Sequence, residues 1–240
     1  MRRGHESALK LLLAVALLPA AAAVVAAAVG ALGGLLERRA DTQSFLIGCA
    51  SYPLVHLAAA GLGGGLRRLL YVLGHELTHA IAAWMSGYKV HRLSVRPDGG
   101  HVDVSRSNAF VALAPYVFPL YALGVVLAYR LWLWNGGPRP GGAAHEVFLL
   151  ALGAALSFHW VFTATALWTV RQPDLAAAGG AVFSLVLIAL GNGLIVLGAL
   201  KCLFPKLVSL EAAAALAARF TAGVWVGLYR LLERAVAAAV

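Results

Sequence analysis

Long apolar segments separated by short polar breaks make up most of the chain. A helix that crosses a bilayer needs about 20 mostly apolar residues. Segments of about this length cover residues 11–36, 45–66, 69–86, 108–133, 147–170, 181–200 and 207–240. Residues 45–66 either cross or dip in and return, and residues 207–240 either cross or lie along the interface. We therefore predict an all-α polytopic membrane protein with about six transmembrane helices, kinked where Pro115 and Pro119 occur.

Residues 88–105 follow a different pattern, in which apolar and polar side chains alternate. The sequence P-D-G-G at residues 97–100 interrupts the alternation with a turn signal, so the pattern predicts a short β-hairpin insert near residues 88–106. An open sheet edge is not tolerated in lipid, so we expect the hairpin at the membrane surface or in a cavity. We expect His91 and His101 to face each other across it.

The composition is that of a membrane protein throughout. Hydrophobic residues make up 61% of the chain and charged residues 12%, with a mean hydropathy of +0.82, whereas a soluble domain has about 25% charged residues. No polar stretch is long enough for a separate soluble domain. We therefore predict a single membrane domain over residues 1–240, with N-terminal helices in 1–66, a core in 67–200 and a C-terminal helix in 201–240.

The net charge of +9 indicates which partners the chain has. In a soluble protein such a charge would suggest nucleic acid, but here Lys and Arg lie in the short breaks between apolar segments, where they contact lipid headgroups. We therefore predict the lipid bilayer as a partner and no nucleic acid. The bias toward Arg, Ala and Gly suggests a GC-rich bacterial genome, and with it an integral, multi-pass protein of the bacterial inner (cell) membrane.

Two further features have structural interpretations. Basic residues before the uncharged run 11–36 resemble the start of a signal peptide, but the run is longer than a signal-peptide core, so we predict a retained first helix. Cys49 and Cys202 lie far apart in or at the end of apolar segments. We expect them to be packing residues and not a disulfide or a zinc-ligand pair.

The most informative motif is H-E-L-T-H at residues 75–79. On a helix, His75 and His79 project from one face about 6 Å apart, a spacing at which they can share Zn²⁺. Glu76 then lies beside the metal, where it can take a proton from water. Because ionisable residues at membrane depth are costly and usually functional, the motif favours a metalloprotease with its active site in the membrane. The alternative is a polar cluster in which these side chains satisfy one another.

A catalytic zinc ion usually has three protein ligands and one open position, so the motif needs a third ligand. Asp174 is our first choice, because it is the only acidic residue between Glu146 and Glu211 and follows Pro173, where a helix must break. The predicted topology also brings the chain back at this point to the side toward which His79 points. Asp174 would alternatively cap the next helix, since Asp is favoured at that position.

His159 is the rival to Asp174 as third ligand. It lies in the middle of the predicted span 147–170, at a depth that can match the motif. Its other interpretations are a hydrogen-bond donor in the active site or a packing residue between helices. A closed four-ligand site that includes both His159 and Asp174 would indicate a structural metal.

The motif is followed by a hairpin, a proline-containing span and a later Asp near a helix break. In this order the chain resembles the M50 (site-2 protease-like) intramembrane zinc metallopeptidases, as a divergent, compact member. The resemblance covers about residues 69–200, the predicted metallopeptidase-like core, and includes G-G-H-V at 99–102 and A-L-A-P at 112–115. Leu175 follows Asp174, where the family has Gly.

The resemblance implies that His75, His79 and Asp174 bind Zn²⁺ and that Glu76 is the catalytic base. It implies an intramembrane zinc metalloendopeptidase that hydrolyses peptide bonds in or near transmembrane segments, with a membrane protein or peptide as substrate. The alternative is a non-catalytic membrane scaffold or chaperone that retains the peptidase framework. A transporter that uses the His/Glu cluster as a relay predicts inverted repeats, and the sequence has no convincing repeat. The sequence leaves substrate identity, membrane orientation and oligomeric state open.

Overall fold

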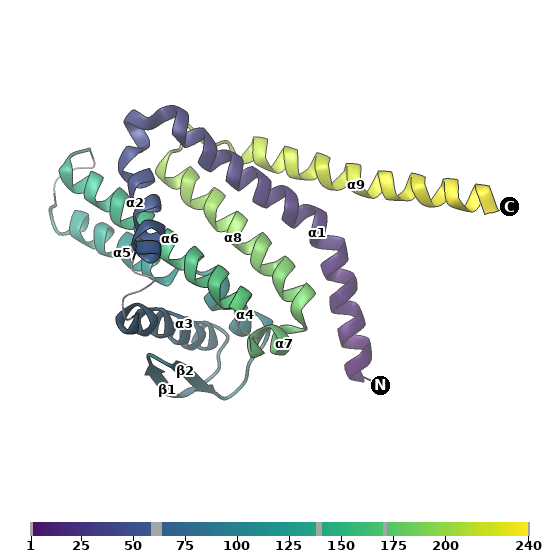
Figure 1. Ribbon diagram of the computed structural model, residues 1–240, viewed down its shortest axis with the longest axis horizontal. Helices are drawn as coiled ribbons and strands as arrows, with labels where there is room; N and C mark the ends of the chain where they lie inside the picture. Colours follow the sequence, from purple (N-terminus) through teal and green to yellow (C-terminus); the bar gives the residue numbers. More distant parts are fainter. Residues whose placement is uncertain (1, 59–63, 138–140, 170–171, 240) are drawn as a thin grey trace. The chain divides into compact units, whose positions relative to one another are not determined.

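The computed structural model describes residues 2–58, 64–137, 141–169 and 172–239, most of them in helices (Figure 1). The helices are α1 (Arg2–Leu35), α2 (Arg39–Ala58), α3 (Gly65–Met85), α4 (Ala109–Val117), α5 (Leu120–Trp134), α6 (Ala143–Thr169), α7 (Pro173–Ala178), α8 (Ala181–Leu203) and α9 (Leu210–Ala239). A 3₁₀ turn at Leu36–Arg38 separates α1 from α2, and strands β1 (Val90–Arg96) and β2 (Gly99–Val104) follow α3. The predominantly helical fold and the hairpin are therefore confirmed.

Four helical segments among the described residues are long and apolar enough to cross a membrane. The pair α4–α5 makes a fifth if it is counted as one bent span. One of the four is the stretch Ala8–Ala58, which contains both α1 and α2. These helices support the predicted multi-pass membrane protein, whereas the number of six spans stays a prediction. Residues 59–63 and 170, which belong to two of the predicted segments, lie outside the described part of the chain.

The chain divides into two compact units. The first comprises residues 38–178 and contains α2 to α7 with the hairpin, and the second comprises residues 1–37 and 179–240 with α1, α8 and α9. In the second unit α1 packs along α8 through buried small side chains, among them Ala14 and Ala21, which contact Val186. The single membrane domain expected over the whole chain stays a prediction.

Glycines bring α2 and α6 together in the first unit. A Cβ atom added at Gly48 would collide with the backbone carbonyl of Leu150, and one added at Gly153 would collide with the backbone carbonyl of Phe45. Close approach of this kind is typical of small residues between membrane helices, because it gains van der Waals contact that lipid cannot supply. The α2–α6 pair, with α5 packed on α6, lies in the same unit as α3, α4 and α7.

The two strands form an antiparallel hairpin that packs against α3. Ser94 lies opposite His101, and an irregularity between Val90 and Arg92 leaves His91 outside the regular pairing. The expectation that His91 faces His101 was therefore wrong. The alternating pattern predicts which residues are extended, but the turn sets the register. Here the turn pairs Arg96 with Gly99, which places Ser94 and not His91 opposite His101.

The two prolines expected to kink the next span have different positions, and the break between α4 and α5 falls at the second one. Helices α4 and α5 meet at 71° at Pro119, the residue before α5. Pro115 lies inside α4, which continues to Val117. The side chain of Asn108 caps α4, since its Oδ1 accepts a hydrogen bond of 2.8 Å from the backbone N–H of Val111.

Candidate metal centre

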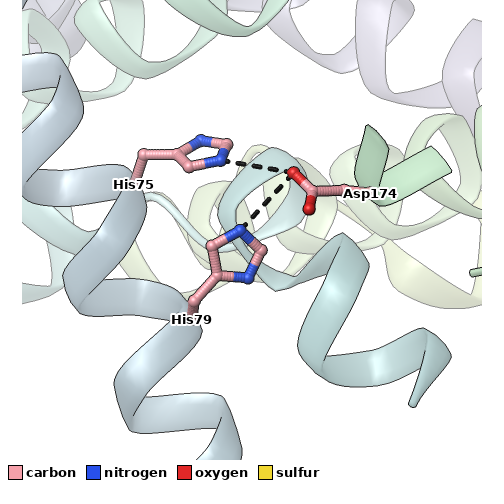
Figure 2. Close-up of side chains that lie close together, drawn as sticks. All are labelled: His75, His79 and Asp174. Atoms are coloured by element: carbon pink, nitrogen blue, oxygen red, sulfur yellow. Dashed lines mark ion pairs between the residues drawn. The ribbon is translucent and has the colours of Figure 1, made fainter. Parts of the chain in front are cut away.

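Helix α3 presents both histidines of the motif on one face, toward Asp174 (Figure 2). The ring centroids of His75 and His79 are 4.8 Å apart and the rings are nearly perpendicular, at 80°. The helix buries His79 and Glu76, each 7% exposed. The i, i+4 spacing therefore brings the two imidazoles together as expected from helix geometry. Helix α3 ends at Met85 with Ser86 as its C-cap, and Gly87 follows with a φ of 74°, the left-handed conformation that commonly ends helices.

Asp174 comes from the short helix α7, which begins at Pro173. Proline is well suited to the first helical position, because its fixed φ is helical and its missing N–H has no partner there. Asp174 is therefore in the first turn of α7 and points toward α3 (Figure 2). Its Oδ2 atom lies 3.5 Å from Nε2 of His75 and 3.5 Å from Nε2 of His79.

These three side chains form the one group of metal-ligand type among the described residues, with all ligand atoms within 4.8 Å of one another. Two ligand atoms that are each about 2.1 Å from a tetrahedral zinc ion lie about 3.4 Å apart. The two His–Asp distances of 3.5 Å match this value. The donor set of two imidazoles and a carboxylate, and its geometry, therefore fit Zn²⁺.

The backbone of α4 fixes the tautomer of His79. Its Nδ1 lies 2.8 Å from the carbonyl oxygen of Val111. Because a carbonyl only accepts hydrogen bonds, Nδ1 carries a proton and donates it, and Nε2 is the nitrogen that faces Asp174. This is the arrangement of most metal-bound histidines, in which the second ring nitrogen donates to a carbonyl or carboxylate.

His75 and Asp174 each have a tyrosine partner. The hydroxyl of Tyr71 lies 3.4 Å from Nδ1 of His75, and the ring of Tyr71 stacks on Phe162 with centroids 4.7 Å apart. The hydroxyl of Tyr116 donates a hydrogen bond of 2.8 Å to Oδ2 of Asp174. Tyr116 is completely buried, so both its ring and its hydroxyl are held by their surroundings.

Hydrogen bonds keep Asp174 ionised. Burial raises the pKa of its carboxyl group, but the hydrogen bonds to His75, His79 and Tyr116 lower it by more. The net result is a pKa well below the ordinary range for Asp. At neutral pH this side chain is therefore a carboxylate, the form that binds a metal ion.

A cleft of about 370 Å³ lies beside the three side chains. Its lining is Tyr71, Val72, His75, Glu76, Gly100, His101, Val102, Gln172, Pro173 and Asp174. The cleft is thus bounded by α3, strand β2 and the start of α7. Glu76 faces the same space as His75 and Asp174, so a water or a substrate in the cleft has access to all three.

The structure brings together three of the predicted ligands and leaves His159 out of the group. His159 lines a small hollow of about 20 Å³ with His75, Tyr121 and Phe158. The ligand roles themselves stay predictions. Sequence reasoning missed Tyr71, Tyr116 and the carbonyl of Val111, because nothing in the pattern of residues indicates which buried tyrosine or carbonyl will approach a ligand.

No curated protein and no solved structure matches the chain. A family model does match, over residues 54–196, and its description is Peptidase M50B-like. The match covers more than half of the chain and contains the motif helix, the hairpin, the bent pair α4–α5 and Asp174. The chain therefore belongs to the M50B-like peptidase family.

Proposed function

We propose that this protein is an intramembrane zinc metalloprotease that hydrolyses peptide bonds in or near the transmembrane segments of membrane proteins. The observation that carries the proposal is the convergence of His75, His79 and Asp174 at 3.5 Å His–Asp distances, beside Glu76 and an accessible cleft. Catalytic zinc sites have three protein ligands and an open position, whereas structural sites have four ligands. The three-membered group therefore favours catalysis over the non-catalytic scaffold.

His75, His79 and Asp174 would hold the ion. Zinc bound there supplies a Lewis acid that polarises a carbonyl group and eases the ionisation of water. Glu76 takes the proton from the attacking water, and the same carboxyl group later delivers this proton to the leaving amine. The C–N bond of the substrate breaks and a C–O bond forms, so Glu76 ends the cycle in the carboxylate form in which it began.

The hairpin supports a mode of substrate binding. A helix hides its backbone amides in internal hydrogen bonds, so a transmembrane substrate has to unwind before hydrolysis. An unwound segment exposes backbone groups that can pair with the edge of a strand. Residues 100–102 of β2 line the cleft next to Glu76, which favours binding of the scissile segment as an extended strand along the hairpin.

Replacement of Glu76 by Gln tests the mechanism. We expect Glu76→Gln to reduce turnover by about 10²–10⁴-fold, because it removes the general base, and to keep one zinc ion per chain, because Glu76 is not a ligand. The substrates would be a library of single-span model peptides in liposomes, with cleavage read by mass spectrometry. Glu211→Gln, in the first turn of α9, is the control and should leave turnover unchanged.

Two results would contradict the proposal. Cleavage by Glu76→Gln at the rate of the unmodified protein would exclude Glu76 as the base. A protein that binds one zinc ion per chain but cleaves no member of the library would favour the scaffold or chaperone function.

A further inference from the structure

Helix α4 contacts two of the three candidate metal ligands. The carbonyl of Val111 accepts the hydrogen bond from Nδ1 of His79, at 2.8 Å, and the hydroxyl of Tyr116 donates to Oδ2 of Asp174, also at 2.8 Å. Helix α4 packs against both α3 and α7, which carry these ligands. Val111 is 1% exposed and Tyr116 is 0% exposed, so water does not compete for either contact.

Because of Pro115, the carbonyl of Val111 can accept a hydrogen bond from a side chain. In an α-helix the carbonyl of residue i accepts the N–H of residue i+4, and for Val111 that residue is Pro115, which has no N–H. The helix continues through Pro115 to Val117, so the carbonyl stays in a rigid, buried position. His79 supplies the hydrogen bond that the helix cannot.

This contact decides which nitrogen of His79 faces the metal site. With Nδ1 donating to Val111, Nε2 is the nitrogen that faces Asp174, 3.5 Å away. A His79 ring without a proton on Nδ1 would leave the buried Val111 carbonyl without this donor, which is unfavourable. The backbone of α4 therefore selects the tautomer that can bind a metal ion.

Tyr116 acts on the other two ligands. Its hydroxyl lies within hydrogen-bonding distance of Oδ2 of Asp174, at 2.8 Å, and of Oε1 of Gln172, at 3.0 Å, and its single proton serves one of them at a time. The edge of its ring packs on the face of His75, with ring centroids 5.1 Å apart and planes at 85°. Tyr116 thus restrains the rotation of both His75 and Asp174.

We propose that Pro115 and Tyr116 are positioning residues for the metal centre. They set the tautomer of His79 and the orientation of Asp174 and His75 before a metal ion binds, and so raise the affinity for zinc. The proposal rests on the metal site of the proposed function but not on peptide hydrolysis. Pro115 and Tyr116 are then part of the metal centre, although neither side chain is a ligand.

The test is the zinc affinity of Pro115→Ala and Tyr116→Phe in the full chain, measured by competition with a chromogenic chelator. Pro115→Ala restores an N–H that competes with His79 for the Val111 carbonyl, and Tyr116→Phe removes only a hydroxyl. We expect each to weaken zinc binding about 10–100-fold, the usual effect of removing a partner of a metal ligand. The matched controls, Pro53→Ala inside α2 and Tyr129→Phe in α5, should bind zinc as the unmodified protein does, since the Tyr129 hydroxyl contacts His145 and no candidate ligand.

A second readout separates positioning from stability. In the metal-free protein labelled with ¹⁵N-histidine, the ring shifts of His79 should report a proton on Nδ1, and Pro115→Ala should shift the population toward the other tautomer. If Pro115→Ala fails to fold, Tyr116→Phe decides the question, because it changes no volume in the core.

The proposal is overturned if Tyr116→Phe and a folded Pro115→Ala bind zinc within twofold of the unmodified protein. It is also overturned if the unmodified protein binds no zinc. Tight zinc binding without peptide cleavage would contradict the protease function and leave this inference standing, so the two failures are distinguishable.

Discussion

Gly100 is the residue through which strand β2 reaches the helix that carries Glu76. A Cβ atom at this position would lie 2.6 Å from Cγ1 of Val72, 2.7 Å from Cγ of Glu76 and 2.8 Å from the carbonyl oxygen of Ser94. Real Cβ atoms do not come this close, so only glycine lets the strand lie on α3. The position of the Glu76 side chain therefore depends on residue 100 of β2 having no side chain.

Replacement of Gly100 by Ala should uncouple catalysis from metal binding. We expect Gly100→Ala to displace either the hairpin or Glu76, and to lower turnover by about 10–100-fold, because a shift of about 1 Å at a catalytic group can have this effect. Zinc affinity should stay unchanged, since Gly100 does not contact a ligand. The measurements are cleavage of the model peptides and chelator competition.

Gly65→Ala is the matched control for this change. It lies at the start of the same α3 helix, where an added Cβ would meet nothing within 4 Å. Full activity of Gly100→Ala, together with full activity of Gly65→Ala, would show that the close packing of β2 on α3 has no part in catalysis.

At the scale of elements, α9 differs from the other long apolar helices. At 100° per residue, its five charged side chains fall within an arc of about 140°; they are Glu211, Arg219, Arg230, Glu233 and Arg234. Every run of 20 residues in α9 contains at least two of them, whereas residues 181–200 of α8 contain no charged residue. Phe220, Leu228 and Leu231, on the opposite side of α9, are between 44% and 63% exposed.

This separation of charges is typical of a helix in the plane of the membrane surface. The link from α8 is short, and Lys201 near the end of α8 donates hydrogen bonds to its carbonyls at Pro205 and Val208. Of the two alternatives that the sequence left open, we therefore expect α9 to lie along the interface and not to cross.

Cysteine labelling checks this expectation in the full chain, with Cys49 and Cys202 replaced by Ala. Residues 212 and 237 lie on the charged side of α9 and are about 38 Å apart along the helix axis. We expect Ala212→Cys and Ala237→Cys to react with a membrane-impermeant maleimide from the same side of the membrane. Ala238→Cys, one position away on the apolar side, should be protected. Reaction of residues 212 and 237 from opposite sides would establish a transmembrane α9.

At the scale of the whole molecule, the candidate ligands join elements that are distant in sequence. His75 and His79 lie in α3, and Asp174 lies in α7, near the end of the unit formed by residues 38–178. An ion held by all three would connect the first part of this unit to its last helix. Binding to the folded state alone stabilises it by about 2.7 kcal/mol when free zinc is at 100 times the dissociation constant.

We therefore expect zinc to raise the thermal unfolding temperature of the purified protein, and chelation to reverse the change. The increase should be lost in His79→Ala and Asp174→Ala, because each removes a ligand. Asp103→Ala is the control, since Asp103 is an exposed carboxylate on the hairpin that pairs with His101 at 3.8 Å. If Asp174→Ala kept the full increase, the third ligand would be elsewhere, with His159 the next candidate.

Local physics explains what the sequence predicted well. The spacing of His75 and His79 determines their common face once the segment is a helix, because the period of 3.6 residues is a property of the backbone. The alternation in residues 88–105 and the P-D-G-G turn determine a hairpin for the same reason. The length and hydropathy of the apolar segments determine helices that are long and apolar enough to cross a membrane. Each of these predictions depends only on residues a few positions apart.

Tertiary structure decided what depends on contacts between distant residues. Asp174 and His159 were both possible partners of the motif from sequence, and the packing of α7 on α4 brings Asp174 to the two histidines. Pro115 and Pro119 looked alike in sequence, yet the bend occurs at Pro119 and Pro115 instead frees a carbonyl for His79. The sequence by itself determined the motif and the elements that carry it. Only the fold decided which side chains from other elements complete the site, because that choice depends on how helices pack and not on the local preferences of the backbone.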